Sequence, residues 1–196
     1  MRPPLLYNVV AVLSRPILRG LFRLRDSGSE NVPVDGGCVL ACNHLSSFDP
    51  WPLGMPLWPR IWLRFMAKAE LYWWPATLVL DAAGAFKVRR GRADVDAIET
   101  AVRLAREGNV VVMFPEGTRR VKGLVKRHQA RARSGAARIA LMADVPLVPA
   151  AVSGTDRLLR LGPLRVAYGP PIEASADSHE TTERLMGEIR RLYETP

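Results

Sequence analysis

The sequence predicts one α/β domain, because short apolar runs of strand length alternate along the chain with longer segments of helical periodicity. The chain has 196 residues, and 48% of them are hydrophobic, which is enough to bury a sizeable core. We expect a central sheet, mostly parallel to mixed and flanked by helices, as the main domain over residues 28–196. Residues 1–27 are expected to form an N-terminal amphipathic helical segment that associates with membranes.

The expected strands are apolar runs bounded by glycine, proline or polar turns. The segment 26–37 is polar and rich in glycine, so we expect a linker into the first strand. The segment 84–91 is expected to run from a short strand into a basic loop. In chain order, the other expected strands cover residues 39–42, 61–67, 109–114, 145–152 and 164–168.

The expected helices show apolar residues at helical spacing. The segment 93–107 has a clear pattern, and a glycine follows as its stop signal. The segment 70–80 is apolar and contains Trp73 and Trp74, which either are buried or face a membrane. Two further helices are expected over residues 135–143 and 178–193.

The N-terminal segment combines apolar and basic side chains. Its longest uncharged stretch, 3–14, is too short to span a bilayer, and no small-residue cleavage site follows, so we expect neither a membrane span nor a signal peptide. Pro16 is expected to divide the segment, and the second piece to be a basic amphipathic helix in the headgroup region of an anionic membrane. The alternative is a helix packed on the core with its arginines in water. This helix would carry Arg15, Arg19 and Arg23 on one face and Leu18, Leu21 and Phe22 elsewhere.

The chain is strongly basic, with a formal net charge of +9 and a pI of about 10.4, so an anionic membrane surface or a polyanion is an expected partner. Only four of the 28 basic residues are lysines, and the arginine excess suits either phosphate binding or a GC-rich genome. Cys38 and Cys42 fall on one face of an expected strand. We expect them to be core thiols in a reducing compartment, with no zinc site.

The run 39–42 ends in Asn43 and His44, and a polar turn then leads to Asp49 and Pro50. Pro50 can open a helix, and Asp49 is a good residue to cap it. His44 would then lie at the carboxyl end of a strand, where α/β sheets place their chemistry. Asp49 can fold back to one imidazole nitrogen and leave the other free to take a proton, as in a general base with its orienting acid. Alternatively, a histidine five residues before an aspartate arises by chance.

A second loop, after the run NVVVMF, has the composition of an anion site. Gly117 lets the backbone approach a ligand closely, and the Thr118 hydroxyl with exposed N–H groups can bind an anion. Arg119 offers a planar fork for phosphate oxygens. Glu116 cannot itself hold phosphate, so it would orient Arg119 or Arg90, or bond a substrate hydroxyl. The plain alternative is an ordinary turn with an arginine on the surface.

Four sequence blocks follow one another in the chain. In motif, order and approximate spacing they resemble the four blocks of the 1-acylglycerol-3-phosphate acyltransferase family, which belongs to the wider glycerolipid acyltransferase superfamily. The resemblance spans roughly residues 28–172, and four blocks in order are far more specific than one. The blocks are NHLSSFD (43–49), GAFKVRR (84–90), FPEGTR (114–119) and VPLVP (145–149).

The resemblance implies roles for particular residues. His44 matches the catalytic base of the family, and Asp49 matches the residue that orients it. The chain departs from the family pattern at Arg89, where the family often has Asp, and at Arg120, where it often has Ser. Both departures add positive charge and leave the acceptor headgroup open. The residues that match the blocks linked to the acceptor's phosphate are Gly84, Arg90, Glu116, Gly117 and Arg119.

The implied reaction moves a fatty acyl group from acyl-CoA or acyl carrier protein to the free hydroxyl of 1-acylglycerol 3-phosphate, forming phosphatidic acid. Direct transfer is preferred over a serine nucleophile, because the G-x-S-x-G elbow is absent around Ser46 and Ser47. No metal or redox cofactor is implied. We expect a peripheral or monotopic enzyme on the cytoplasmic face of the cell membrane.

Three alternatives remain at this point. Within the enzyme class, the acceptor can be glycerol 3-phosphate or another lysophospholipid or glycolipid headgroup. A non-catalytic, basic membrane-binding protein would keep the fold, but the intact His44, Asp49, Glu116 and Arg119 argue against it. A nucleic-acid-binding domain would explain the charge, but no nucleic-acid motif appears, so no nucleic-acid partner is expected.

Overall fold

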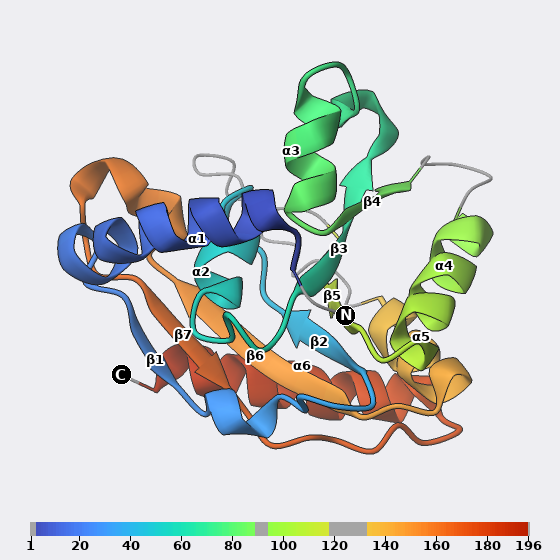
Figure 1. Ribbon diagram of the computed structural model, residues 1–196. Coiled ribbons are helices and arrows are strands. Elements are labelled where there is room, and N and C mark those ends of the chain that lie inside the picture. Colours follow the sequence, from blue (N-terminus) through green and yellow to red (C-terminus); the bar gives the residue numbers. More distant parts are fainter. Residues whose placement is uncertain (1–2, 89–93, 118–132, 196) are drawn as a thin grey trace.

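The computed structural model describes residues 3–88, 94–117 and 133–195. In this part of the chain one seven-stranded sheet forms the centre, with the strand order β1-β7-β6-β2-β5-β3-β4 (Figure 1). All neighbouring strands are parallel except β6 and β7, which are antiparallel. The strands are β1 (Arg25–Ser27), β2 (Cys38–Cys42), β3 (Leu63–Lys68), β4 (Ala85–Val88), β5 (Val110–Met113), β6 (Leu147–Ser153) and β7 (Arg165–Tyr168).

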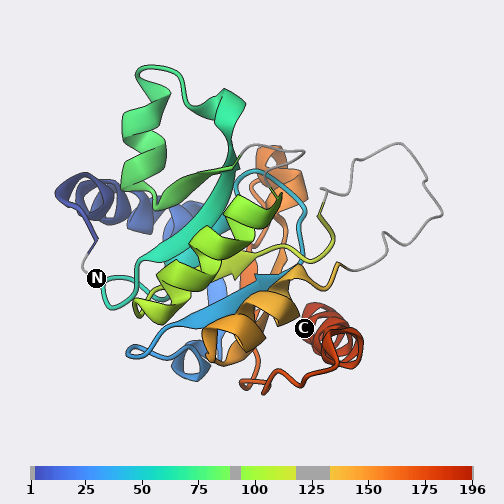
Figure 2. The same cartoon turned by 90° about the vertical axis from the view of Figure 1, so that its right-hand side faces the viewer.

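Helices cover both faces of the sheet, which confirms the predicted α/β class (Figures 1 and 2). The central strand β2 is buried on both faces: Leu40 packs in the layer with α1 and α2, and Val39 packs in the layer with α4, α5 and α6. Continuous apolar runs of this kind are typical of parallel sheets. The helices are α1 (Leu5–Pro16), α2 (Pro50–Gly54), α3 (Ala76–Ala82), α4 (Asp94–Arg106), α5 (Gly135–Ala143) and α6 (Ser178–Glu194).

Two expected elements are wrong. The segment 26–37 is not a plain linker, because its first residues belong to the edge strand β1, which pairs with β7. This strand has only three residues and no apolar run, so hydrophobic pattern does not reveal it. The expected helix 70–80 is instead a 3-10 turn, Ala69–Leu71, followed by the short helix α3. Pro75 separates the two, because proline has no N–H to donate within a helix and is accepted only at its start.

The N-terminal segment also differs from expectation. α1 ends at Pro16, where the sequence predicts the division, but the second piece is a single π-helical turn, Ile17–Leu21, after which Phe22 N–H donates to the Ile17 carbonyl at 3.0 Å. Leu18, expected to face lipid, is buried in the core with Ala11. The Trp58 indole donates to Asn8 Oδ1 at 2.9 Å, and this hydrogen bond links α1 to the rest of the domain. No helix among the described residues has the length and apolar character needed to cross a bilayer.

Gly84 lies where β3 and β4 begin, and the chain there requires a glycine. Its φ is +93°, and a Cβ atom at this position would lie 2.0 Å from the carbonyl oxygen of Leu63 in β3. The Gly84 carbonyl in turn accepts a hydrogen bond from Phe65 N–H at 3.2 Å. The close approach of the two backbones therefore depends on the missing side chain.

Gly84→Ala should lower the free energy of unfolding by at least about 1–3 kcal/mol, because the backbone would be strained and the methyl group would collide with Leu63. Denaturant unfolding measures this loss. Gly187→Ala is the matched control, because Gly187 lies in α6 with no atom near its Cβ position and should keep or gain stability. A Gly84→Ala protein as stable as the wild type would contradict this role.

Candidate active site

The carboxyl ends of three neighbouring strands bring together residues that are far apart in the sequence. β2 pairs in parallel with β5 on one side and with β6 on the other. The segments that follow these strands therefore leave the sheet at the same edge (Figure 1). They carry His44 after β2, the loop 114–117 after β5 and Thr155 after β6. This edge is where parallel α/β sheets hold ligands.

His44 and Asp49 form the hydrogen-bonded pair that the sequence predicts. His44 Nδ1 lies 2.8 Å from Asp49 Oδ2; the aspartate side chain is completely buried, and the histidine side chain is 17% exposed. Asp49 Oδ2 also accepts from the backbone N–H groups of Leu45 at 2.7 Å and Ser46 at 2.9 Å. Because the carboxylate oxygen can only accept hydrogen bonds, Nδ1 of His44 carries the proton. Nε2 is then the nitrogen left to accept a proton.

The capping role expected for Asp49 is wrong. Asp49 does precede α2, and Pro50 does open the helix, but the carboxylate makes no hydrogen bond to the first turn. It turns back instead to the loop N–H groups and to His44, and its second oxygen accepts from Thr155 Oγ1 at 2.5 Å. The imidazole N–H and these other donors together satisfy the carboxylate better than one helix N–H would.

One further contact is made with the imidazole itself, and a second interaction fixes the backbone next to it. The Phe114 ring stacks on the His44 ring, with a centroid separation of 4.1 Å and an interplanar angle of 22°. Asn43 is buried and bonds both backbone groups of Val152: its Nδ2 donates to the carbonyl at 2.9 Å, and its Oδ1 accepts from the N–H at 2.8 Å. The ends of β2 and β6 are thereby joined directly beside His44.

The structure brings the start of the FPEGTR block to the same edge. Glu116 is buried here, near Cys42: burial first, and then the charges of Asp49 and Glu116, raise the pKa of the Cys42 thiol. Gly117 lies against Arg133, whose Nε is 3.1 Å from the position a Cβ would take, and Arg133 N–H donates to the Pro115 carbonyl at 3.0 Å. A guanidinium therefore lies beside this loop.

Three predicted site residues, Arg90, Thr118 and Arg119, lie outside the described residues. Gly84 is described, but it lies at the amino end of β4, away from the edge that holds His44. β4 is also three strands from β2, which corresponds to about 14 Å across the sheet. Contact of Gly84 with a substrate stays a prediction, distinct from its backbone role.

The nearby thiol and hydroxyl groups are poor candidates for a nucleophile. Cys42 is free and buried, and burial is the first cause of its raised pKa, so it stays a neutral thiol. The Ser46 hydroxyl accepts from Phe48 N–H at 3.3 Å within the turn. His44 is thus the residue of this edge best placed to activate a substrate group.

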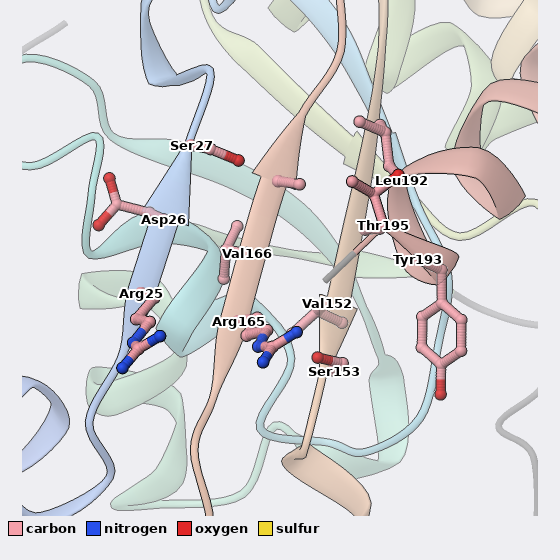
Figure 3. A pocket seen from close by; sticks show the side chains of 12 residues that line it. Arg25, Asp26, Ser27, Val152, Ser153, Arg165, Val166, Leu192, Tyr193 and Thr195 are labelled. Atoms are coloured by element: carbon pink, nitrogen blue, oxygen red, sulfur yellow. The ribbon is translucent and has the colours of Figure 1, made fainter.

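A separate cavity of about 190 Å³ lies on the α6 side of the sheet (Figure 3). It is lined by β1, β7, the end of β6 and the end of α6, with the side chains of Arg25, Arg165 and Tyr193 among its walls. Neither His44 nor Asp49 lines it. Its acidic residue, Asp26, is paired with Arg19 at 2.7 Å. The carboxylate among the described residues that line this cavity is therefore held in an ion pair.

Sequence reasoning missed several contributors to the site. Asn43 and Phe114 lie inside recognised blocks, but which groups they contact depends on strand neighbours far along the chain. Thr155 and Arg133 lie outside every block. A threonine after a strand and one arginine of a basic segment carry no distinctive signal, so only the folded chain identifies them.

Known proteins resemble this chain in both sequence and fold. Residues 23–153 match a protein-family model described as Acyltransferase. The 1-acyl-sn-glycerol-3-phosphate acyltransferase of Bacillus subtilis is 34% identical over 162 residues, which covers 80% of this chain and 77% of that protein. The enzyme of the same name from Salmonella typhimurium is 27% identical over 176 residues, covering 81% of this chain and 66% of that protein.

A solved structure agrees at the level of fold. The crystal structure of the 1-acyl-sn-glycerophosphate (LPA) acyltransferase PlsC from Thermotoga maritima superposes with a TM-score of 0.73 at 23% identity. The match covers 94% of this chain and 77% of that chain. The sheet-edge site, the family match over most of the chain and the Bacillus relative lead to one conclusion: the chain belongs to the acyltransferase family.

Proposed function

We propose that this acyltransferase moves a fatty acyl group from acyl-CoA or acyl carrier protein to the free hydroxyl of 1-acylglycerol 3-phosphate, with His44 as general base. The observation that carries the proposal is the 2.8 Å hydrogen bond between His44 Nδ1 and the buried Asp49, which leaves Nε2 to take a proton. The acceptor is proposed from the names of the Bacillus and Salmonella relatives.

The reaction follows from this geometry. Nε2 of His44 removes the proton of the acceptor hydroxyl as its oxygen attacks the thioester carbonyl. When the tetrahedral intermediate collapses, the carbon–sulfur bond breaks and the imidazolium returns the proton to the leaving thiolate. Asp49 holds the tautomer and stabilises the imidazolium. General-base assistance of this kind contributes about 10²–10⁴ in rate.

The acceptor's phosphate needs cations near His44. We propose Arg119 and Arg90 for this role from the family resemblance, with Gly117 giving the phosphate close access to the backbone. Arg133 supports the proposal, because it places a guanidinium against Gly117. Glu116, buried at the same edge, would orient these arginines or bond a substrate hydroxyl. Binding the phosphate would hold the hydroxyl near Nε2 and remove much of the entropic barrier.

We also propose that the enzyme takes up its lipid substrate from an anionic membrane surface on which α1 lies. The inward face of α1 packs on the core, while its outward face exposes large apolar side chains. Arg15 is exposed next to them, whereas Arg19 is paired with Asp26. The exposed apolar residues of this surface, on α1 and the π-helical turn that follows it, are Leu5, Leu6, Val9, Val10, Val12, Leu13, Ile17 and Leu21.

Helix α3 extends the same surface. It stands beside α1 in both views of the molecule and contains no buried residue (Figures 1 and 2). In α3, Leu78 is 59% exposed and Val79 is 63% exposed. Trp73 and Trp74, which precede the helix, are 62% and 81% exposed. Exposed tryptophans beside aliphatic side chains suit the boundary between lipid headgroups and acyl chains.

His44→Ala should lower kcat by about 10²–10⁴-fold, because the general base is lost, while the protein keeps its unfolding curve. The assay follows labelled acyl groups from acyl-CoA or acyl carrier protein into a panel of acceptors: 1-acylglycerol 3-phosphate, glycerol 3-phosphate and other lysophospholipids. We expect phosphatidic acid to be the main product of the wild type. His179→Ala is the control, because His179 is exposed on α6 and should be dispensable. Near-wild-type turnover of a folded His44→Ala enzyme would disprove the mechanism.

The double variant Val12→Gln/Leu13→Gln should weaken binding to vesicles by about tenfold or more, because two apolar side chains are lost from the lipid-facing surface. Co-sedimentation with vesicles of phosphatidylglycerol and phosphatidylcholine measures the effect. Val95→Gln/Leu141→Gln is the matched control, because it changes one exposed valine and one exposed leucine on the opposite helical layer. Equal binding by the two double variants would contradict the assignment of α1 to the membrane.

A further inference from the structure

We infer that Thr155 is a positioning residue for acyl transfer, acting through Asp49; the inference rests on the proposed role of His44 and Asp49. Thr155 lies 106 residues after Asp49 and outside every block that resembles the family. Its hydroxyl donates to Asp49 Oδ1 at 2.5 Å, and both residues are buried, with exposed fractions of 2% and 0%.

The fold holds Thr155 at this place from two sides. Asn43 bonds both backbone groups of Val152, so the end of β6 has a fixed position relative to the end of β2. The chain then turns at Gly154, where φ is +88° and a Cβ would lie 2.5 Å from the Pro163 carbonyl oxygen. Thr155 follows as the first residue of a 3-10 turn, Thr155–Arg160. The hydroxyl therefore reaches Asp49 from a backbone position that these hydrogen bonds and the tight turn define.

The hydroxyl completes the set of donors around the carboxylate. Oδ2 accepts from His44, Leu45 and Ser46, whereas among the described residues Thr155 is the donor to Oδ1. A buried carboxylate with an unfilled oxygen would rotate toward other donors or admit water. Either change would move Oδ2 away from the imidazole, so Thr155 sets the orientation of His44 without contacting the substrate.

The test compares variants that separate the hydroxyl from the methyl group. Thr155→Val removes the hydroxyl at nearly constant volume and should lower kcat roughly ten- to hundredfold, with little change in the KM of acceptor or donor. Thr155→Ser should restore most of kcat, and Thr155→Ala should not. The comparison of Thr155→Ser with Thr155→Ala tests the role of the hydroxyl even if Thr155→Val fails to fold. Thr181→Val is the matched control: Thr181 is equally buried and hydrogen-bonded, but lies at the start of α6.

A second readout is independent of turnover. The proton that an imidazole shares with a carboxylate resonates far downfield in the NMR spectrum, and the signal missing from His44→Ala identifies it. We expect Thr155→Val to shift or broaden that signal and Thr181→Val to leave it unchanged. Full activity in His44→Ala would disprove the proposed mechanism. Two other results would overturn the role of Thr155 alone, provided that His44→Ala is inactive. One is a Thr155→Val enzyme with the wild-type kcat and NMR signal. The other is a Thr155→Ser enzyme as slow as Thr155→Ala.

Discussion

The buried negative charge of Asp49 is the constraint on which this site depends. A carboxylate removed from water is costly unless donors surround it, and here the donors come from an imidazole, two loop N–H groups and a distant hydroxyl. Each donor needs a particular backbone path. The turn after β2 must bring Leu45 and Ser46 around the carboxylate, and β6 must end where Thr155 can reach it. The charge thus couples the local turn to the order of the strands.

The parallel sheet supplies that coupling. β2 lies between β5 and β6, although about 70 and 110 residues of sequence separate them from it, and all three point the same way. One edge consequently receives His44, which we propose as the base, the Phe114 ring that stacks on it and the loop expected to bind phosphate. The same sheet carries α1 on one layer, with an apolar face turned outward. The site at this edge and the proposed lipid-binding surface therefore lie in the same domain.

Most of the architecture could be predicted from periodicity. The helix 135–143 has the same bounds in the structure, and the helix 93–107 differs by one residue at each end. Elements without an apolar pattern were missed, such as β1 with its three residues. The sequence predicts wrongly that Leu18 faces lipid, because a helical pattern shows which residues share a face of the helix but not which face packs on the core. The bond between His44 and Asp49 could be predicted because it is local, whereas Thr155 and Arg133 depend on tertiary contacts.

The most direct test of this account is the kinetic effect of Asp49→Asn. Asparagine has nearly the same shape, but its amide can donate to Nδ1 and so stabilise the tautomer in which Nε2 already carries a proton. The account predicts a folded enzyme whose kcat is lower by about 10³–10⁴-fold, with the KM values of acceptor and donor changed far less. An Asp49→Asn enzyme that folds and turns over within about tenfold of the wild type would show that the buried charge does not orient the base.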